Sequence, residues 1–180
     1  MVRPEDVLPI VHDAARLART GTLIVFGSGA LSLWLSEAPL SRDVDLIVLP
    51  PERSHPVEAV MGELSWYHDK HGSYVECSPP ETLAAPESWL VRARKLHFSD
   101  APDVEILVPH PHDILLSKVE RFDPHDQDYV RRILRELPLS RDELAALAAD
   151  MPHRSASISD PRRRQSFELH LVVVASWCPS

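Results

Sequence analysis

The sequence predicts an α+β (α/β) fold, in which a small β-sheet with flanking helices is followed by a C-terminal helical part. Short, β-branched apolar segments bounded by glycine or proline are typical of buried strands. The segments between them repeat apolar residues at helical spacing. After residue 109 every periodic segment has the helical pattern. We therefore expect a core at residues 1–109 and a helical subdomain, packed on that core, at residues 110–180.

The first part of the chain alternates expected helices with expected strands. Helices are expected at residues 4–19, 30–36 and 57–64, and strands at 22–26, 43–49, 73–77 and 104–108. The Gly-Ser-Gly segment at residues 27–29 is expected to form a tight turn. Pro50 and Pro51 end the second strand, because proline cannot donate a hydrogen bond to a sheet. His68 and His71 are expected in a surface loop.

The second part of the chain has only helical patterns. Helices are expected at residues 113–121, 126–137, 142–149 and 162–174. Each begins near an aspartate, whose side chain can accept a hydrogen bond from a backbone N–H of the first turn. Asp113, Asp142 and Asp160 are expected to be such caps. Asp160-Pro161 is a strong helix start, since proline is favoured at the first helical position.

Composition and charge exclude several classes of protein. The 180 residues are 44% apolar and 26% charged, the balance of a soluble globular protein. The net charge of −8 argues against broad, charge-driven binding to nucleic acid. Cys77 and Cys178 are too few for a disulfide framework, and the longest apolar stretch, residues 169–177, is too short to cross a bilayer. We expect a cytoplasmic protein that does not contact membranes.

The segment from residue 25 to residue 48 combines polar groups that suit a metal–phosphate complex. Asp43 and Asp45 alternate along the second strand, so their side chains lie on one face, about 7 Å apart. Two neighbouring carboxylates repel each other, and a divalent cation such as Mg²⁺ removes that repulsion. Gly27 and Ser28 precede the second helix, where backbone N–H groups and the serine hydroxyl can bind a phosphate.

These residues resemble a known signature. Gly27-Ser28, followed after residues 29–42 by Asp43-x-Asp45, is similar to the motif of the DNA polymerase beta-type nucleotidyltransferase superfamily. The resemblance implies a small mixed sheet, with Gly-Ser holding the triphosphate of a nucleotide and the aspartates holding Mg²⁺. It also implies a third acid from a later strand, for which Glu105 has the right position, although many minimal members lack this acid.

The helical part extends the resemblance. Residues 112–119, followed by Asp126 and Asp128, resemble the helical region of bacterial nucleotidyltransferases that include toxins of the AbiEii and MenT type. The resemblance implies that Lys118 contacts the nucleotide phosphates and that Asp126 assists catalysis or orients the lysine. His125 stands where that family usually has a basic residue. The second acid is displaced by one position, which leaves the roles of Asp126 and Asp128 open.

The function implied is Mg²⁺-dependent transfer of a nucleoside monophosphate from an NTP (ATP or CTP) to an acceptor hydroxyl. A toxin of a toxin–antitoxin pair would have a cognate antitoxin as partner and a tRNA or a protein as acceptor. An antibiotic-modifying nucleotidyltransferase and a non-catalytic binding module of the same fold remain alternatives. The sequence leaves open the acceptor, the base of the NTP and the oligomeric state.

Other interpretations, structural or functional, exist for several of these motifs. Asp43 and Asp45 could be solvated charges on an exposed edge strand. The Gly-Ser-Gly segment also fits a dinucleotide-binding turn. Taken alone, Lys118 fits a solvated helix position, and the run Arg162 to Arg164 fits a solvated first turn. His110-Pro111-His112 offers two metal ligands in a loop.

Overall fold

The computed structural model describes residues 2–37, 41–152 and 161–179. The chain divides into two compact units. The first comprises Met1–Thr82 and Ala93–Pro109, and the second comprises Leu83–Arg92 and His110–Ser180. The sequence places one boundary between residues 109 and 110. The structure also assigns residues 83–92 to the second unit.

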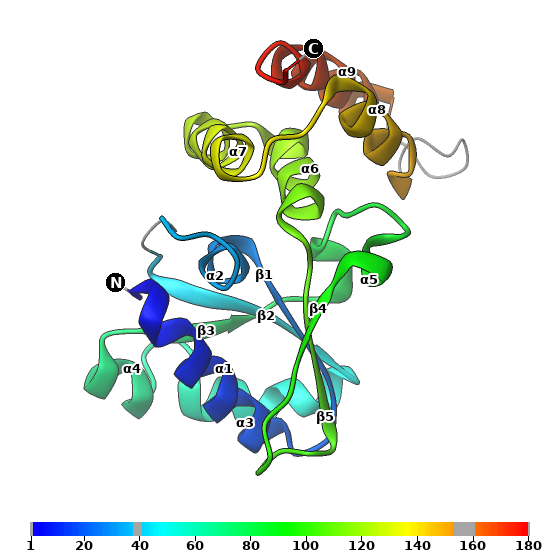
Figure 1. The fold of residues 1–180 in the computed structure, drawn as a ribbon. Coiled ribbons are helices and arrows are strands. Elements are labelled where there is room, and N and C mark those ends of the chain that lie inside the picture. The colour runs from blue at the N-terminus through cyan, green and yellow to red at the C-terminus, as the bar shows by residue number, and fades with distance from the viewer. Residues whose placement is uncertain (1, 38–40, 153–160, 180) are drawn as a thin grey trace. The chain divides into compact units, whose positions relative to one another are not determined.

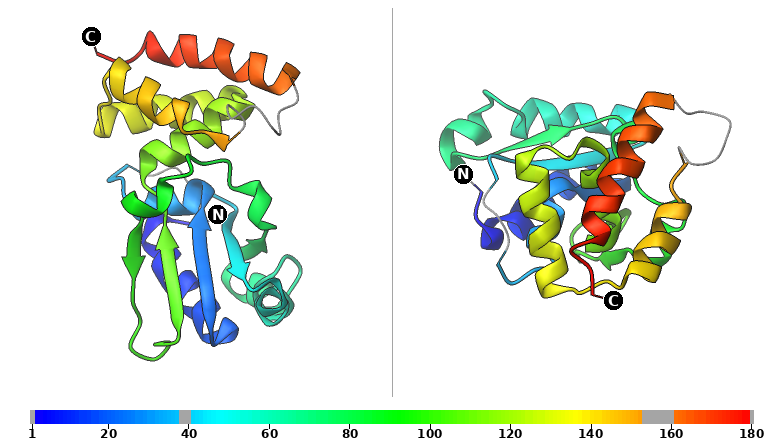
Figure 2. Two further views of the ribbon diagram at one scale, coloured as in Figure 1. Left: turned by 90° about the vertical axis from the view of Figure 1, so that its right-hand side faces the viewer. Right: turned by 90° about the horizontal axis from the view of Figure 1, so that it is seen from above.

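The first unit is built on a five-stranded mixed sheet with the strand order β3-β2-β1-β5-β4. The strands are β1 (Gly21–Phe26), β2 (Asp43–Leu49), β3 (Tyr74–Cys77), β4 (Arg94–Leu96) and β5 (Val104–Val108). The β1–β2 and β4–β5 pairs are antiparallel, whereas the β1–β5 and β2–β3 pairs are parallel. Figure 2 shows β5, β1 and β2 side by side in its left view. The predicted α+β fold class is therefore confirmed.

The helices of the first unit pack on one face of this sheet (Figure 1). They are α1 (Pro4–Ala18), α2 (Gly27–Ser32), α3 (Ser54–Met61) and α4 (Trp66–His71), with short 3-10 turns at Pro51–Arg53 and Pro80–Thr82. A Cβ on Gly29 of α2 would lie 3.3 Å from Val44 Cγ1, so α2 covers the Val44 face of β2. Helix α1 contacts both α2 and α3, which places all three helices on that face.

Strand β2 divides its side chains between the two faces of the sheet. Val44 and Leu46 are fully buried beneath the helical layer, and Val48 is 3% exposed. Burying one such aliphatic side chain contributes about 1.5–3 kcal/mol. Because side chains alternate along a strand, Asp43 and Asp45 project from the opposite face.

The second unit is helical. Its helices are α5 (Trp89–Arg92), α6 (Pro111–Arg121), α7 (Pro124–Glu136), α8 (Arg141–Ala149) and α9 (Pro161–Ala175). Helix α6 packs against both α7 and α9, and Figure 2 shows α7, α8 and α9 in its right view. Leu115, Ile133 and Phe167 are fully buried in this unit. Within the described residues, no helix has both the length and the apolar character that crossing a membrane requires.

Several elements of the first unit differ from the prediction, and the helix expected at residues 57–64 is observed at Ser54–Met61 as α3. Residues 27–29 begin helix α2 rather than forming a separate turn, and α2 ends at Ser32 rather than at residue 36. Residues 66–71 form helix α4, so His68 and His71 lie on a helix and not in a loop. The Ser65 side chain caps α4 by accepting a hydrogen bond from the His68 N–H. Strand β4 lies within residues 87–96, a segment whose polar residues lack the clear apolar alternation of a strand.

The predicted aspartate caps of the second unit are also corrected. Helix α6 is capped by the ring of His110, and helix α8 by Ser140 in a capping box with Glu143. Asp142 therefore lies inside the first turn of α8. Asp113 is fully buried instead and forms an ion pair with Arg92 at 2.6 Å. Asp160 lies outside the described residues.

Candidate functional site

Three carboxylates converge on the face of the sheet opposite to α1, α2 and α3. Asp43 and Asp45 come from β2, and Glu76 comes from the neighbouring parallel strand β3, where it pairs in register with Asp45. One ligand oxygen from each of the three carboxylates lies within 4.8 Å of the other two. Asp43 and Asp45 are half-buried, whereas Glu76 is exposed. Two adjacent strands thus hold three acids at the spacing of a cation site.

The carboxylate of Asp45 lies against the backbone at the start of α2. Gly27 has a φ of +63°, in the left-handed region that favours glycine. A Cβ at this position would collide with Asp45 Oδ2. The glycine is therefore required twice, once by its backbone conformation and once by the carboxylate beside it. This contact brings the Gly-Ser segment and the aspartate strand together, as the sequence predicts.

A chain of hydroxyl groups joins Ser28 to Asp43. The Ser28 hydroxyl donates to Ser41 Oγ at 2.8 Å, and the Ser41 hydroxyl donates to Asp43 Oδ1 at 3.0 Å. Ser28 is only 7% exposed. The backbone of Ser41 is held by an isolated bridge to Val2, whose N–H donates to the Ser41 carbonyl at 2.6 Å. Sequence reasoning missed Ser41, although its alternation with Asp43 and Asp45 could have indicated it.

Two groups at the cluster have raised pKa values, for reasons of burial and of neighbouring charge. Burial and the nearby Asp43 carboxylate raise the pKa of Glu76, and Glu63 adds to this effect. Burial and the same Asp43 carboxylate raise the pKa of the Tyr74 hydroxyl. In both groups the Asp43 carboxylate is the largest electrostatic cause after burial. A bound cation would offset this negative charge.

Glu76 takes the place that the sequence suggests for Glu105. Glu105 lies on β5, where its carboxylate pairs with Lys95 at 2.6 Å. In the sheet register it is level with Thr22, at the opposite end of β1 from Phe26, which pairs with Asp45. The structure thus brings Glu76, and not Glu105, to the two aspartates. Pairing between β2 and β3, which sequence spacing does not specify, decides this difference.

The donor set of this cluster fits a magnesium ion. Mg²⁺ is a hard cation that prefers carboxylate oxygens, and it is commonly bound through a few carboxylates with water and substrate phosphate filling the remaining positions. Asp43, Asp45 and Glu76 supply only carboxylate oxygens. Burial raises the pKa of Glu76, and the nearby Asp43 carboxylate raises it further. Among the residues that the structure describes, this is the single group of three or more acids, histidines or cysteines arranged in this way.

Lys118 and Asp126 lie in the second unit, where they form an ion pair of 3.2 Å. Asp126 is fully buried and also accepts from the Arg121 guanidinium at 2.7 Å. Burial alone would raise the pKa of Asp126, but Arg121 and Lys118 together hold it below its ordinary value. Asp128 is exposed and pairs only loosely with Arg131, at 3.7 Å. Of the two aspartates, Asp126 is therefore the one that contacts the lysine.

The structure also removes three alternative interpretations. Strand β2 lies between β1 and β3, so Asp43 and Asp45 are not on an edge strand. Strands β1 and β2 are antiparallel, whereas a dinucleotide-binding turn joins parallel strands. His110 accepts the N–H of His112 at the start of α6, and His112 Nε2 lies 3.0 Å from the Leu137 carbonyl, so both rings have structural contacts.

A mixed sheet that carries Asp-x-Asp on an inner strand, beside a Gly-Ser helix start, has the arrangement of a small nucleotidyltransferase core. Residues 5–176 match the model of the family described as "nucleotidyltransferase of unknown function (DUF6036)". The chain belongs to this family. No curated protein and no solved structure gives a significant match.

Proposed function

We propose that this protein is a Mg²⁺-dependent nucleotidyltransferase that transfers a nucleoside monophosphate from an NTP to an acceptor hydroxyl. The convergence of Asp43, Asp45 and Glu76 beside Gly27 and Ser28 carries this proposal. Membership of a nucleotidyltransferase family supports the reaction class. ATP and CTP are the NTPs that the resemblance suggests.

Each group of the cluster has a distinct task in this reaction. Asp43, Asp45 and Glu76 would hold Mg²⁺, which when bound neutralises charge that develops on the phosphoryl oxygens. Ser28 would donate its hydroxyl to a phosphate oxygen, which requires its proton to turn away from Ser41. Gly27 leaves room for the Asp45 carboxylate at the start of α2.

The transfer itself forms one bond and breaks one. The acceptor oxygen bonds to the α-phosphorus, the bond from that phosphorus to the bridging oxygen breaks, and pyrophosphate leaves. The acceptor must also lose its proton. We assign acceptance of this proton to a carboxylate oxygen of Glu76, the exposed member of the cluster.

The resemblance assigns Lys118 a contact with the nucleotide phosphates, and Asp126 the orientation of that lysine. The 3.2 Å ion pair between them supports the second assignment. Asp126 is fully buried, so its carboxylate can hold the lysine ammonium in one position.

Label transfer tests the proposal directly. The purified chain is incubated with Mg²⁺, each α-labelled NTP and a total cell extract, which is then separated into RNA, protein and small molecules. We expect label in one fraction, and we expect Asp45→Asn to abolish it while Glu105→Gln leaves it unchanged. The proposal is wrong if no fraction is labelled with any NTP, or if Asp45→Asn labels as well as the wild type.

The identity of the labelled fraction would also distinguish a toxin, an antibiotic-modifying enzyme and a binding module. Label in tRNA or protein, with growth arrest on expression that a neighbouring gene product relieves, would indicate a toxin with an antitoxin. Label in a small molecule, with antibiotic resistance and normal growth, would indicate a modifying enzyme. NTP binding that does not depend on Mg²⁺, without label transfer, would indicate a binding module.

A further inference from the structure

The first unit exposes large apolar side chains around helix α4. Within the described part of this unit, four such side chains are exposed: Leu8, Val60, Leu64 and Trp66. They come from α1, from α3 and from the segment that leads from α3 into α4. Neighbouring apolar side chains in contact with water are typical of a surface that binds another protein, because a partner removes them from water.

Leu64 is unfavourable for the isolated fold in two ways. Its side chain is 86% exposed, and its φ of +64° lies in the left-handed region that leucine rarely adopts. The Leu64 N–H donates to Nδ1 of His68 at 3.1 Å, and this hydrogen bond holds the backbone in place. Trp66, two residues further on, is 66% exposed. The stability of the single chain explains neither exposure, whereas a binding surface explains both.

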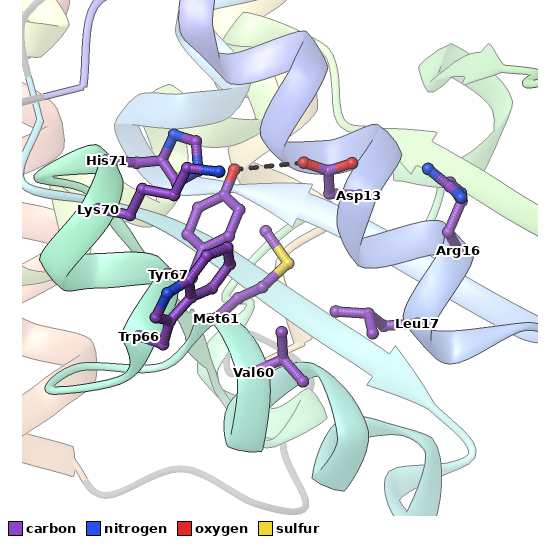
Figure 3. A pocket seen from close by; sticks show the side chains of 9 residues that line it. All are labelled: Asp13, Arg16, Leu17, Val60, Met61, Trp66, Tyr67, Lys70 and His71. Carbon is purple, nitrogen blue, oxygen red and sulfur yellow. Dashed lines mark hydrogen bonds between the residues drawn. The ribbon is translucent and has the colours of Figure 1, made fainter.

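Trp66 borders a pocket of about 480 Å³ between α1, α3 and α4 (Figure 3). The floor of the pocket is apolar, formed by Leu17, Val60 and the fully buried Met61. The polar side chains around it already have partners within the chain: Arg16 with Asp100, Lys70 with the Trp66 ring, and Tyr67 with Asp13. The pocket therefore offers apolar contact to a ligand rather than an unpaired charge.

This apolar surface continues around the edge of the sheet to the carboxylate cluster. Strand β3 is an edge strand, and its Tyr74 and Glu76 alternate with the buried Val75, so they project from the face that carries the cluster. Helix α4 lies beside this strand, where the ring of His68 packs on the ring of Tyr74 with centroids 5.0 Å apart. Helix α4 thus connects the pocket side of the unit to the cluster side.

The segment before α4 lies close to the proposed base. Glu63 contributes to the raised pKa of Glu76, after burial and Asp43, which places its carboxylate near the cluster. Leu64 is the next residue. The pocket itself lies among α1, α3 and α4, and α1 and α3 cover the opposite face of the sheet. An acceptor that contacts both the pocket and Glu76 therefore has to be larger than a metabolite.

The charge of the first unit disfavours a nucleic acid as this large acceptor. The unit has eight lysines and arginines against fifteen aspartates and glutamates. Nucleic acids are bound chiefly by lysine and arginine contacts to their phosphates. Glu63 adds a further negative charge beside Glu76. A polyanion would be repelled here, whereas a protein with an apolar surface would not.

We propose that the acceptor is a protein, which docks by apolar contact on Leu64, Trp66 and the pocket that Trp66 borders. This inference rests on the proposed nucleotidyl transfer and specifies its acceptor. The oxygen of a serine, threonine or tyrosine side chain of the docked protein bonds to the α-phosphorus. Its proton passes to Glu76, the bond to the bridging oxygen breaks, and pyrophosphate leaves.

Initial rates of label transfer test the inference. The chain is incubated with Mg²⁺, each α-labelled NTP and a dilute total cell extract, and we expect label in the protein fraction. The double variant Leu64→Asn/Trp66→Ser should label that fraction about tenfold more slowly or worse, the loss expected when interface anchors are removed. Asparagine tolerates the left-handed backbone, so the fold should be retained.

Two controls separate docking from chemistry. Leu169→Gln removes an exposed leucine of α9 and should leave the rate of protein labelling unchanged. The Mn²⁺ affinity of the double variant, measured by electron paramagnetic resonance, should equal that of the wild type. Once the labelled protein is identified by mass spectrometry and purified, its binding to the Asp45→Asn chain gives a readout without turnover. Adding the double variant should weaken this binding about tenfold.

The outcomes distinguish this inference from the proposed reaction. Label in RNA or in small molecules overturns the protein acceptor and leaves the proposed reaction intact. Protein labelling at an unchanged rate in the double variant overturns the docking surface. The absence of label from every fraction, with every NTP, overturns the proposed reaction and this inference with it.

Discussion

Two groups of acids in this molecule differ in the charges that surround them. In the second unit, the buried Asp126 contacts Lys118 and Arg121, and its pKa is lowered. In the first unit, Glu76 is close to Asp43 and Glu63, and its pKa is raised. The same chemical group thus shifts in opposite directions, because of its neighbours. An acid that contacts cations of its own chain stabilises the fold, whereas the acids that lie close to one another are those that we propose to hold Mg²⁺.

The largest effect should come from breaking the carboxylate cluster. Asp45→Asn should slow nucleotidyl transfer by about a thousandfold or more, because charge in the transition state would go unbalanced. Single-turnover label transfer measures the loss of rate, and titration with Mn²⁺ measures the loss of metal affinity. Glu76→Gln should share the defect, and Glu105→Gln should not. Equal rates for Glu76→Gln and Glu105→Gln would contradict the placement of Glu76 in the site.

Breaking the ion pairs that Asp126 makes with Lys118 and Arg121 should lower the stability of the protein. Asp126→Asn leaves the ammonium of Lys118, which is 15% exposed, without its partner and should cost about 3 kcal/mol of unfolding free energy. Urea denaturation measures this cost. Asp128→Asn is the matched control on the same helix, and its exposed carboxylate should change stability by less than about 0.5 kcal/mol. If Asp126→Asn costs no more unfolding free energy than Asp128→Asn, the buried ion pair contributes little to stability.

A smaller effect should appear as a pH dependence of the second unit. Burial, with the charges of His112 and Arg92, lowers the pKa of His110 from 6.5 to about 4. Between these pH values the unfolded chain binds a proton that the folded chain does not, so stability falls as the pH falls from 6.5 towards 4. Protonation at Nδ1 would also prevent acceptance of the His112 N–H.

We expect this loss to be about 1–2 kcal/mol, less than the full pKa difference implies because the ring is partly exposed. Chemical denaturation at a series of pH values measures it. His110→Asn keeps a capping side chain without an ionisable group, so its stability should vary less across this pH window. An unchanged slope in that variant would assign the pH dependence to another group.

The smallest effect should come from the hydroxyl chain. Ser41→Ala removes the hydrogen bond to Asp43 Oδ1 and should weaken Mn²⁺ binding about two- to fivefold, as expected for one hydrogen bond to a charged group that is open to water. Electron paramagnetic resonance of free Mn²⁺ measures the affinity without requiring turnover. Ser41→Thr keeps the hydroxyl and should restore wild-type binding. If Ser41→Thr binds as weakly as Ser41→Ala, the hydroxyl is not the cause.

The sequence predicted those features that depend on local chemistry. Strands β1, β2 and β5 are apolar and β-branched, and the Asp43-x-Asp45 alternation needs only strand geometry. Glu76 could not be recognised in this way, because its position beside Asp45 depends on pairing between strands that helices separate in the chain. The pocket behind Trp66 likewise depends on the packing of three helices. At the starts of α6 and α8 the sequence pattern favours an aspartate as the cap, whereas the structure uses the histidine or serine before it.

The fit between Gly27 and Asp45 has a consequence for related sequences. Any larger residue at the first position would displace the acid at the second, so the two positions should change together during evolution. A relative that has alanine in place of this glycine is expected to have lost the paired aspartate as well. Such relatives would be family members that retain the fold but lack the proposed activity. Comparison of the two positions in an alignment would be enough to find them.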